Sequence, residues 1–272
     1  MYVDNGGISM SKRNIKSDII VIKVGTSTLT YETGKLNLKR LDILSRIISD
    51  LKNSGKRVVL VSSGAIGVGM SKLGMTQRPQ SVKEKQAIAA VGQCELMSIY
   101  DRLFAEYGTV VAQILLTKDV LTNKERNDNI INTFNVLLDK GIVPIVNEND
   151  SISIDEIKFG DNDTLSSIVS KIVNADTLII LSDIDGLYNK NPREYSDAKI
   201  IRQIDVIDNS VEEMASGAGS NRGTGGMITK ITAAKMATET GTDVVIANGC
   251  DPHIIYDILD GEEIGTIFTG RK

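Results

Sequence analysis

The stretch IIVIKVGTSTLT, residues 19–30, decides which class of fold the chain adopts. Its apolar run at 19–24 is typical of a strand buried on both faces, and the glycine that follows predicts a turn. The same alternation of apolar strands and amphipathic helices continues along the chain. It predicts strands at 19–24, 57–61, 109–116, 142–146, 177–181 and 243–247, helices at 37–53, 81–107, 124–140, 163–174 and 228–240, and a small hairpin at 151–160.

We therefore predict an α/β fold, a three-layer αβα sandwich with a mostly parallel central sheet, because strands that are apolar throughout need helices over both faces. Residues 1–17 are polar and lack a periodic apolar pattern, so we expect a disordered extension, with Met10 as an alternative start. No proline-rich or serine-rich linker divides residues 18–272, which predicts a single domain of two lobes. Ligands of such sheets bind beyond the carboxyl ends of the strands.

Charge and composition exclude several classes of function. Lys and Arg number 31 against 35 Asp and Glu, and this net charge of −4 argues against nucleic acid or a membrane surface as a partner. The longest uncharged stretch, 58–71, is too short to span a membrane. Two cysteines and one histidine argue against a disulfide framework, a Cys or multi-His metal site and a His-based triad. We expect a cytoplasmic protein, with Cys94 in its core.

The first two loops combine glycines with candidate anion ligands. Lys23 lies inside the apolar run at 19–24, where a lysine is either ion-paired or extends its stem to solvent. The glycine and hydroxyl groups that follow it favour a phosphate ligand instead. The loop VSSGAIGVG at 61–69 has three glycines whose backbone can approach an anion, although such loops are as often tight turns. It does not match the dinucleotide fingerprint, and the chain contains no Walker-type P-loop.

The next two loops, NEND at 147–150 and FGDND at 159–163, are acidic. Capping of the following helix explains Asp161 or Asp163 taken alone. Two such clusters in one cleft repel each other unless ammonium groups or Mg²⁺ lie among them. Their four carboxylates belong to Glu148, Asp150, Asp161 and Asp163.

Two further loops suit a nucleotide. LSDIDGLYNKNP at 181–192 is a polar turn after a strand, and GSNRGTGGMITK at 219–230 is a glycine-rich stretch before a helix. Backbone N–H groups at a helix start attract anions. Lys230 falls in the first turn of that helix, where it is either a phosphate ligand or a solvated surface lysine.

Six motifs, in this order, resemble those of the glutamate 5-kinase family, which has the amino acid kinase fold. They are VIKVGTS (21–27), VSSGAIGVG (61–69), NENDS (147–151), KFGDNDTLS (158–166), LSDIDGLY (181–188) and GTGGMITK (223–230). The resemblance extends over residues 18–268. It implies transfer of the ATP γ-phosphoryl group, with Mg²⁺, to the γ-carboxylate of L-glutamate, the first step of proline biosynthesis. It also implies an N-terminal substrate-binding lobe and a C-terminal ATP-binding lobe.

The resemblance implies roles for the residues that match the family motifs. Lys23 and Lys230 flank the transferring phosphoryl group, and a carboxylate between two lysines, Asp163, would fix their ammonium groups. Asp161 assists Mg²⁺ or the substrate, and no metal ligand is otherwise assigned. The implied glutamate site is Ser63, Gly64, Ala65, Asn147, Asp150 and Asn162. The implied ATP site is Lys23, Ser182, Asp183, Thr224, Gly225, Gly226, Met227, Ile228, Thr229 and Lys230.

The implied partners are L-glutamate, ATP, proline as a feedback inhibitor, and glutamate-5-semialdehyde dehydrogenase (γ-glutamyl phosphate reductase) as the pathway partner. The resemblance also implies a homo-oligomer, either a dimer or a tetramer. Many family members continue into a PUA domain, an RNA-binding type of module, which we expect to be absent because the sequence ends at Lys272. Two alternatives remain: a non-catalytic sensor of ATP or an amino acid, and a sister kinase acting on acetylglutamate, aspartate, carbamate or UMP.

Overall fold

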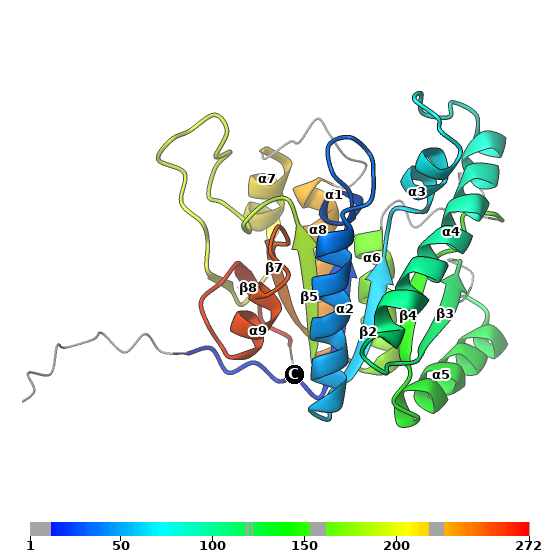
Figure 1. Cartoon of the computed structure of the whole chain (residues 1–272). Coiled ribbons are helices and arrows are strands. Elements are labelled where there is room, and N and C mark those ends of the chain that lie inside the picture. Colours follow the sequence, from blue (N-terminus) through cyan, green and yellow to red (C-terminus); the bar gives the residue numbers. More distant parts are fainter. Residues whose placement is uncertain (1–11, 118–119, 121, 153–161, 218–225, 272) are drawn as a thin grey trace, which may run out of the picture.

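One central sheet organises the computed structural model, which describes residues 12–117, 120, 122–152, 162–217 and 226–271. Within these residues eight strands pair in the order β3-β4-β2-β1-β5-β7-β8-β6 (Figure 1). Neighbouring strands are parallel except for the antiparallel pair β7 and β8. The strands are β1 (Ile19–Val24), β2 (Arg57–Ser62), β3 (Val111–Leu116), β4 (Val143–Glu148), β5 (Thr177–Ser182), β6 (Gln203–Ile204), β7 (Asp243–Asn248) and β8 (Thr266–Phe268).

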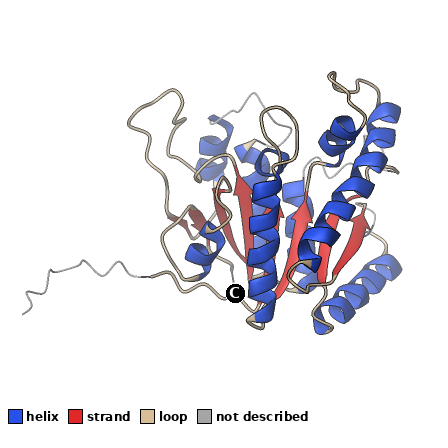
Figure 2. Ribbon diagram, in the orientation of Figure 1, coloured by secondary structure: helices blue, strands red, loops and turns tan. Residues whose placement is uncertain are grey.

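Helices cover both faces of this sheet, which confirms the predicted three layers (Figure 2). Alternate residues of β1 show the reason: Ile19 and Val21 belong to the core under α5, α6, α7 and α8, whereas Ile20 and Ile22 belong to the core under α2, α4 and α9. The helices are α1 (Thr26–Leu29), α2 (Leu38–Asn53), α3 (Ala65–Lys72), α4 (Val82–Ala105), α5 (Lys124–Asp139), α6 (Asn162–Val173), α7 (Asn209–Gly217), α8 (Met227–Thr238) and α9 (Ile254–Leu259).

Every predicted strand and helix that lies in the described residues is present, with ends displaced by at most two residues. The elements that the sequence did not predict are short: α1, α3, α7, α9, β6 and β8. The predicted hairpin at 151–160 lies largely outside the described residues. Cys94 is exposed on α4, so its predicted place in the core is wrong; the buried face of α4 carries Gln93 and Leu96 instead.

Residues 12–17 differ from the predicted disordered extension, because they lie against the body of the protein. The Arg13 guanidinium donates to the carbonyl oxygens of Ile264 at 2.7 Å and Arg202 at 2.6 Å. The Thr177 hydroxyl donates to the carbonyl oxygen of Lys16 at 2.5 Å. The segment therefore lies against the residues that lead into β6 and β8 and against the start of β5. None of the helices in the described part of the chain has the length and apolar composition of a membrane span.

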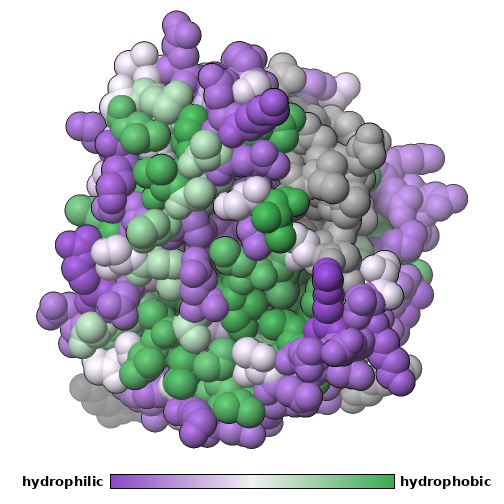
Figure 3. All heavy atoms as spheres, turned by 90° about the vertical axis from the view of Figure 1, so that its right-hand side faces the viewer, coloured by the Kyte–Doolittle hydropathy of each residue, from purple (hydrophilic) through white to green (hydrophobic). Residues whose placement is uncertain are grey.

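One edge of the sheet is formed by β3 and the other by β6. Figure 3 views the molecule from the β3 side and shows apolar side chains gathered in a hollow on it. Val110, which precedes β3, is 62% exposed, and Val136 on α5 is 53% exposed. Among the described residues no strand pairs with the outer side of β3, and an unpaired strand edge beside exposed apolar side chains is typical of surfaces that pair with another chain.

Helices α3 and α4 pack with their backbones in direct contact. A Cβ atom added at Gly92 of α4 would lie 1.7 Å from the carbonyl oxygen of Ala65, and one added at Gly69 of α3 would lie 2.1 Å from that of Ile88. Only glycine permits so close an approach. The packing fixes Ala65, at the start of α3, against the middle of α4.

We expect Gly92→Ala to lower the free energy of unfolding by about 1–3 kcal/mol, because the new methyl group has to push the two backbones apart. Gly67→Ala on α3 is the control, since its Cβ would meet Thr26 at an ordinary 3.8 Å and should gain helix propensity. Urea denaturation measures both. A Gly92→Ala variant as stable as Gly67→Ala would show that α3 and α4 are not held in this contact.

Candidate active site

The loops that carry the predicted site residues meet at one edge of the sheet. Because β1, β2, β4, β5 and β7 are parallel, their carboxyl ends all lie at the upper edge of the sheet in Figure 1. Helices α1, α3 and α8 begin at the same edge. Polar residues that are distant in sequence therefore face a common space.

A buried ion cluster lies at the centre of this edge. Lys23 occupies the middle strand β1, opposite Val61 of β2 and Ile180 of β5, and its side chain is 5% exposed. Its Nζ lies 2.5 Å from Oδ1 of Asp163, whose side chain is fully buried in the first turn of α6. Lys230 Nζ, from the first turn of α8, lies 3.0 Å from the other oxygen, Oδ2. Asp163 thus holds both ammonium groups, as the sequence predicted, and α6 begins before it, at Asn162.

The Thr229 hydroxyl also donates to Asp163 Oδ2, at 3.0 Å. Each carboxylate oxygen of Asp163 therefore has a partner, and the ammonium groups of Lys23 and Lys230 lie on opposite oxygens of the same carboxylate. A pair of buried ammonium groups sharing one carboxylate favours an anion in the adjoining space. This arrangement suits a transferring phosphoryl group.

The preceding residue, Asn162, begins a network of amides on the β2 and β4 side. Asn162 Nδ2 donates to Ser63 Oγ at 2.9 Å, to the carbonyl oxygen of Ser62 at 2.9 Å and to Asn147 Oδ1 at 2.8 Å. Asn147 Nδ2 in turn donates to Gln93 Oε1 at 2.8 Å. The structure thus brings together three of the predicted glutamate-site residues, and it adds Gln93, which the sequence did not reveal.

The other three predicted glutamate-site residues flank this network. Gly64 has a φ of 102° and precedes α3, a left-handed conformation that favours glycine. Ala65 is the first residue of α3, so its N–H is among those that the helix leaves unpaired and that attract carboxylates. Asp150 is half-buried in the turn after β4.

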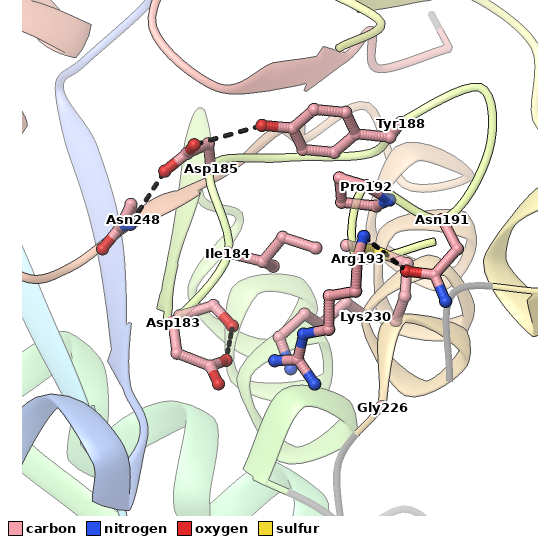
Figure 4. Close-up of a pocket in the computed structure, with 12 residues that line it drawn as sticks. Asp183, Ile184, Asp185, Tyr188, Asn191, Pro192, Arg193, Gly226, Lys230 and Asn248 are labelled. Carbon is pink, nitrogen blue, oxygen red and sulfur yellow. Dashed lines mark hydrogen bonds between the residues drawn. The ribbon is translucent and has the colours of Figure 1, made fainter. Parts of the chain in front are cut away.

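A pocket of about 280 Å³ opens on the opposite side of the ion cluster (Figure 4). It contains four predicted ATP-site residues, Ser182, Asp183, Gly226 and Met227, in addition to Lys230. Five further lining residues, Ile184, Asp185, Tyr188, Asn191 and Pro192, belong to the loop at 181–192 that the sequence predicted to suit a nucleotide. Arg193 and Asn248, which the sequence did not reveal, complete the lining. Predicted residues Thr224 and Gly225, like Asp161, lie outside the described residues. Ile228 is 43% exposed and does not line the pocket.

Two features of the pocket suit a nucleotide. Figure 4 shows the Arg193 side chain reaching into the pocket on the side of Asp183 and Lys230, where a polyphosphate needs positive charge. On the far wall, Asp185 accepts hydrogen bonds from Asn248 at 2.8 Å and from the Tyr188 hydroxyl at 3.1 Å. Burial, and then the bond to Asp185, raise the pKa of Tyr188, so its hydroxyl stays a proton donor.

Comparison with known proteins agrees with this geometry. The sequence profile of the amino acid kinase family matches residues 18–248. The chain belongs to the amino acid kinase family. It is 60% identical to a glutamate 5-kinase of Clostridium perfringens (strain 13 / Type A) over 267 residues, which are 97% of this chain and 99% of the relative.

Two further comparisons extend this result. A glutamate 5-kinase of Clostridium tetani (strain Massachusetts / E88) is 52% identical over 93% of this chain and 95% of its own. Among solved structures, carbamate kinase from Giardia lamblia bound to AMP-PNP superposes with a TM-score of 0.66 at 16% identity, covering 93% of this chain and 98% of that one. The structural likeness confirms the fold, and the two sequence relatives indicate the branch of the family.

We expect Asp163→Asn to lower the free energy of unfolding by about 3–5 kcal/mol, because two buried ammonium groups lose their counter-charge. The control is Asp197→Asn, which breaks an exposed ion pair with Lys190 and should cost about 1 kcal/mol or less. Guanidinium denaturation without ligands measures both. Equal losses would mean that the Asp163 carboxylate does not balance buried charge.

Proposed function

We propose that the chain catalyses ATP-dependent phosphorylation of the γ-carboxylate of L-glutamate, which produces γ-glutamyl phosphate for proline biosynthesis. The observation that carries the proposal is the position of the Lys23–Asp163–Lys230 cluster. It lies between an amide-lined site and a pocket suited to a nucleotide, as a reaction between two bound anions requires. The glutamate 5-kinase relatives support glutamate as the acceptor.

The reaction does not require the protein to remove a proton from the acceptor. The γ-carboxylate has a pKa of about 4.3 and is already a nucleophile at neutral pH, so no general base is needed. The remaining work is to align the carboxylate with the γ-phosphate and to neutralise charge as the phosphoryl group moves. Lys23 and Lys230 supply that charge from the two sides of Asp163.

Magnesium ion fits this site as part of the nucleotide. Among the described residues no group of three or more His, Cys, Asp or Glu side chains could hold a metal ion. Mg²⁺ commonly reaches kinases bound to phosphates and water, with one or two carboxylates from the protein. When bound it would neutralise phosphate charge, and Asp161 is the candidate that would assist either Mg²⁺ or the substrate.

The substrate groups match the two sides of the cluster. On the glutamate side, Asp150 pairs with the α-ammonium group, Asn162 and Ser63 hold the polar groups beside it, and the N–H groups at Gly64 and Ala65 receive a carboxylate. On the ATP side, Ser182, Asp183 and residues 224–230 hold the nucleotide, and Arg193 joins them. The N-terminal and C-terminal halves of the fold thus bind glutamate and ATP respectively.

The partners follow from the same chemistry. Proline carries the same α-carboxylate and a similar ammonium group, which supports feedback inhibition at the glutamate site. The product is a reactive acyl phosphate, which supports glutamate-5-semialdehyde dehydrogenase as the partner that consumes it. The apolar face beside β3 supports the homo-oligomer that the resemblance implies.

A panel of acceptors tests the proposed function. The protein is incubated with ATP, Mg²⁺ and either glutamate, acetylglutamate, aspartate, carbamate or UMP, and ADP release is recorded. We expect turnover with glutamate, and a hydroxamate when hydroxylamine traps the acyl phosphate. Faster turnover with another acceptor would identify a sister kinase, and tight ATP binding without turnover of any acceptor would identify a sensor.

We expect Lys230→Ala to lower kcat by about 10²–10³-fold while the KM for glutamate changes little, because the lost charge acts mainly on the transition state. Lys235→Ala is the control, since Lys235 lies on the same helix but pairs with Glu212. Steady-state kinetics with glutamate as the varied substrate measures both variants. An increase confined to the KM for glutamate would contradict the role given to Lys230.

Asp150→Asn should weaken glutamate binding by about tenfold or more and leave nucleotide binding nearly unchanged, because the α-ammonium group of bound glutamate loses its counter-charge while the nucleotide binds on the other side of the ion cluster. Calorimetry with glutamate and, separately, with a non-hydrolysable ATP analogue measures the two affinities. Equal losses for both ligands would remove the assignment of Asp150 to the substrate ammonium group.

A further inference from the structure

Gln93 is a polar residue on the buried face of α4, between the apolar residues Ala89 and Leu96. Its side chain lies on the protein interior, with the residue only 9% exposed. A buried amide without a hydrogen-bond partner lowers the free energy of unfolding by about 1–3 kcal/mol. An apolar residue would therefore stabilise this face better, unless the amide forms hydrogen bonds that the protein needs. The motifs that point to the active site do not include this residue.

Gln93 does form such hydrogen bonds, at one end of a chain of amide side chains. Gln93 Oε1 accepts from Asn147 Nδ2 at 2.8 Å, and Asn147 is itself 3% exposed. Asn147 Oδ1 then accepts from the backbone N–H of Glu148 at 2.9 Å and from Asn162 Nδ2 at 2.8 Å. Three amide side chains, from α4, β4 and α6, thus form one chain of hydrogen bonds that ends in the active site.

The direction of these bonds fixes which way each amide faces. A side-chain amide donates from its nitrogen and accepts at its oxygen. The backbone N–H of Glu148 can only donate, so Asn147 has to turn its oxygen toward it. Its nitrogen then needs an acceptor on the other side, and Gln93 Oε1 supplies one.

The same reasoning carries the orientation on to Asn162. Its Nδ2 faces three acceptors, which belong to Ser62, Ser63 and Asn147. Its oxygen, on the other branch of the amide, accepts no hydrogen bond from the residues that the structure describes. An oxygen oriented in this way is an acceptor for the ammonium group of an amino acid substrate.

We propose that Gln93 is a positioning residue for the glutamate site: it holds the Asn147 amide in one orientation, and through Asn147 it sets that of Asn162. This inference rests on the proposed function for the identity of the ligand. Its neighbour Gly92 fixes Ala65 by backbone contact, so α4 supports two walls of the site with consecutive residues. Neither residue needs to touch the substrate to do so.

Kinetics of a double-mutant cycle tests the proposal. Gln93→Met keeps the length of the side chain but removes the strong acceptor, and we expect it to raise the KM for glutamate about tenfold with little change in the KM for ATP. In an Asn147→Ala background the same substitution should have almost no further effect, because Gln93 acts through Asn147. Gln203→Met on β6 is the control, since it removes an exposed hydrogen bond to Asp205 and should change neither KM.

The proposal would be overturned if Gln93→Met raised the KM for glutamate by the same factor in the Asn147→Ala background as in the wild-type protein. An unchanged KM for glutamate in the Gln93→Met variant would also overturn it. NMR of side-chain amides provides a readout that needs no substrate. In the unliganded wild-type protein the Asn147 amide protons should be protected from exchange, and in Gln93→Met the Asn162 amide signals should shift while most backbone signals stay in place. Rapid exchange of the Asn147 amide in the wild-type protein would also overturn the proposal, even if Gln93→Met failed to fold.

Failure of the proposed function and failure of the role of Gln93 give different results. Wild-type protein that neither binds nor phosphorylates glutamate would remove the proposed function, whereas the unliganded NMR spectra would still report whether Gln93 orients the two asparagines. Wild-type turnover of glutamate together with independent mutant effects would remove only the role of Gln93.

Discussion

The Asp163 carboxylate, held between two buried ammonium groups, is the interaction on which the rest of the site depends. Burying an ion costs several kcal/mol, and close pairing with further hydrogen bonds is needed to offset that cost. Asp163 meets this condition by giving one oxygen to Lys23 and the other to Lys230 and Thr229. The geometry requires β1, α6 and α8 to be placed relative to each other so that all three contacts form at once.

The surrounding fold supplies that placement. β1 is buried along its whole length in the middle of the sheet, and α6 packs against α8 over one face of it. Because Asn162 and Asp163 are consecutive in α6, the amide network and the ion cluster belong to one rigid unit. A glutamate bound to the amides and a nucleotide bound beside Lys230 are therefore aligned by the same few backbone atoms, which is what phosphoryl transfer demands of its catalyst.

Helix α4 has a less obvious part in this arrangement. It lies on the other face of the sheet from α6, yet two consecutive residues, Gly92 and Gln93, connect it to the start of α3 and to the end of β4. The first connection is steric and the second is a hydrogen bond with a fixed direction. The apolar pattern of α4 indicates a helix that packs against the core, yet α4 also shapes a polar site.

Local sequence patterns are enough to predict the layers of the fold and the loops that carry its polar residues. Apolar runs as short as 19–24 and 177–181 are typical of strands covered on both faces, and parallel strands put their following loops at one edge. Lys23, Asp163 and Lys230 were candidates from the same patterns, but each also had an ordinary structural explanation: a lysine that reaches solvent, a helix cap and a surface lysine. The resemblance carried by the six motifs is what favoured a shared site.

Which of these groups touch becomes visible once the chain is folded. Spacing along the chain does not show that Asp163 takes one ammonium group on each oxygen, since Lys23 precedes Asp163 by 140 residues and Lys230 follows it by 67. Arg193 and Gln93 were invisible for the same reason: one lies in an irregular loop and the other on a helix whose pattern indicates packing. Hydrogen bonds and ion pairs between distant segments are set by how the layers come together, and that distance information is absent from local sequence patterns.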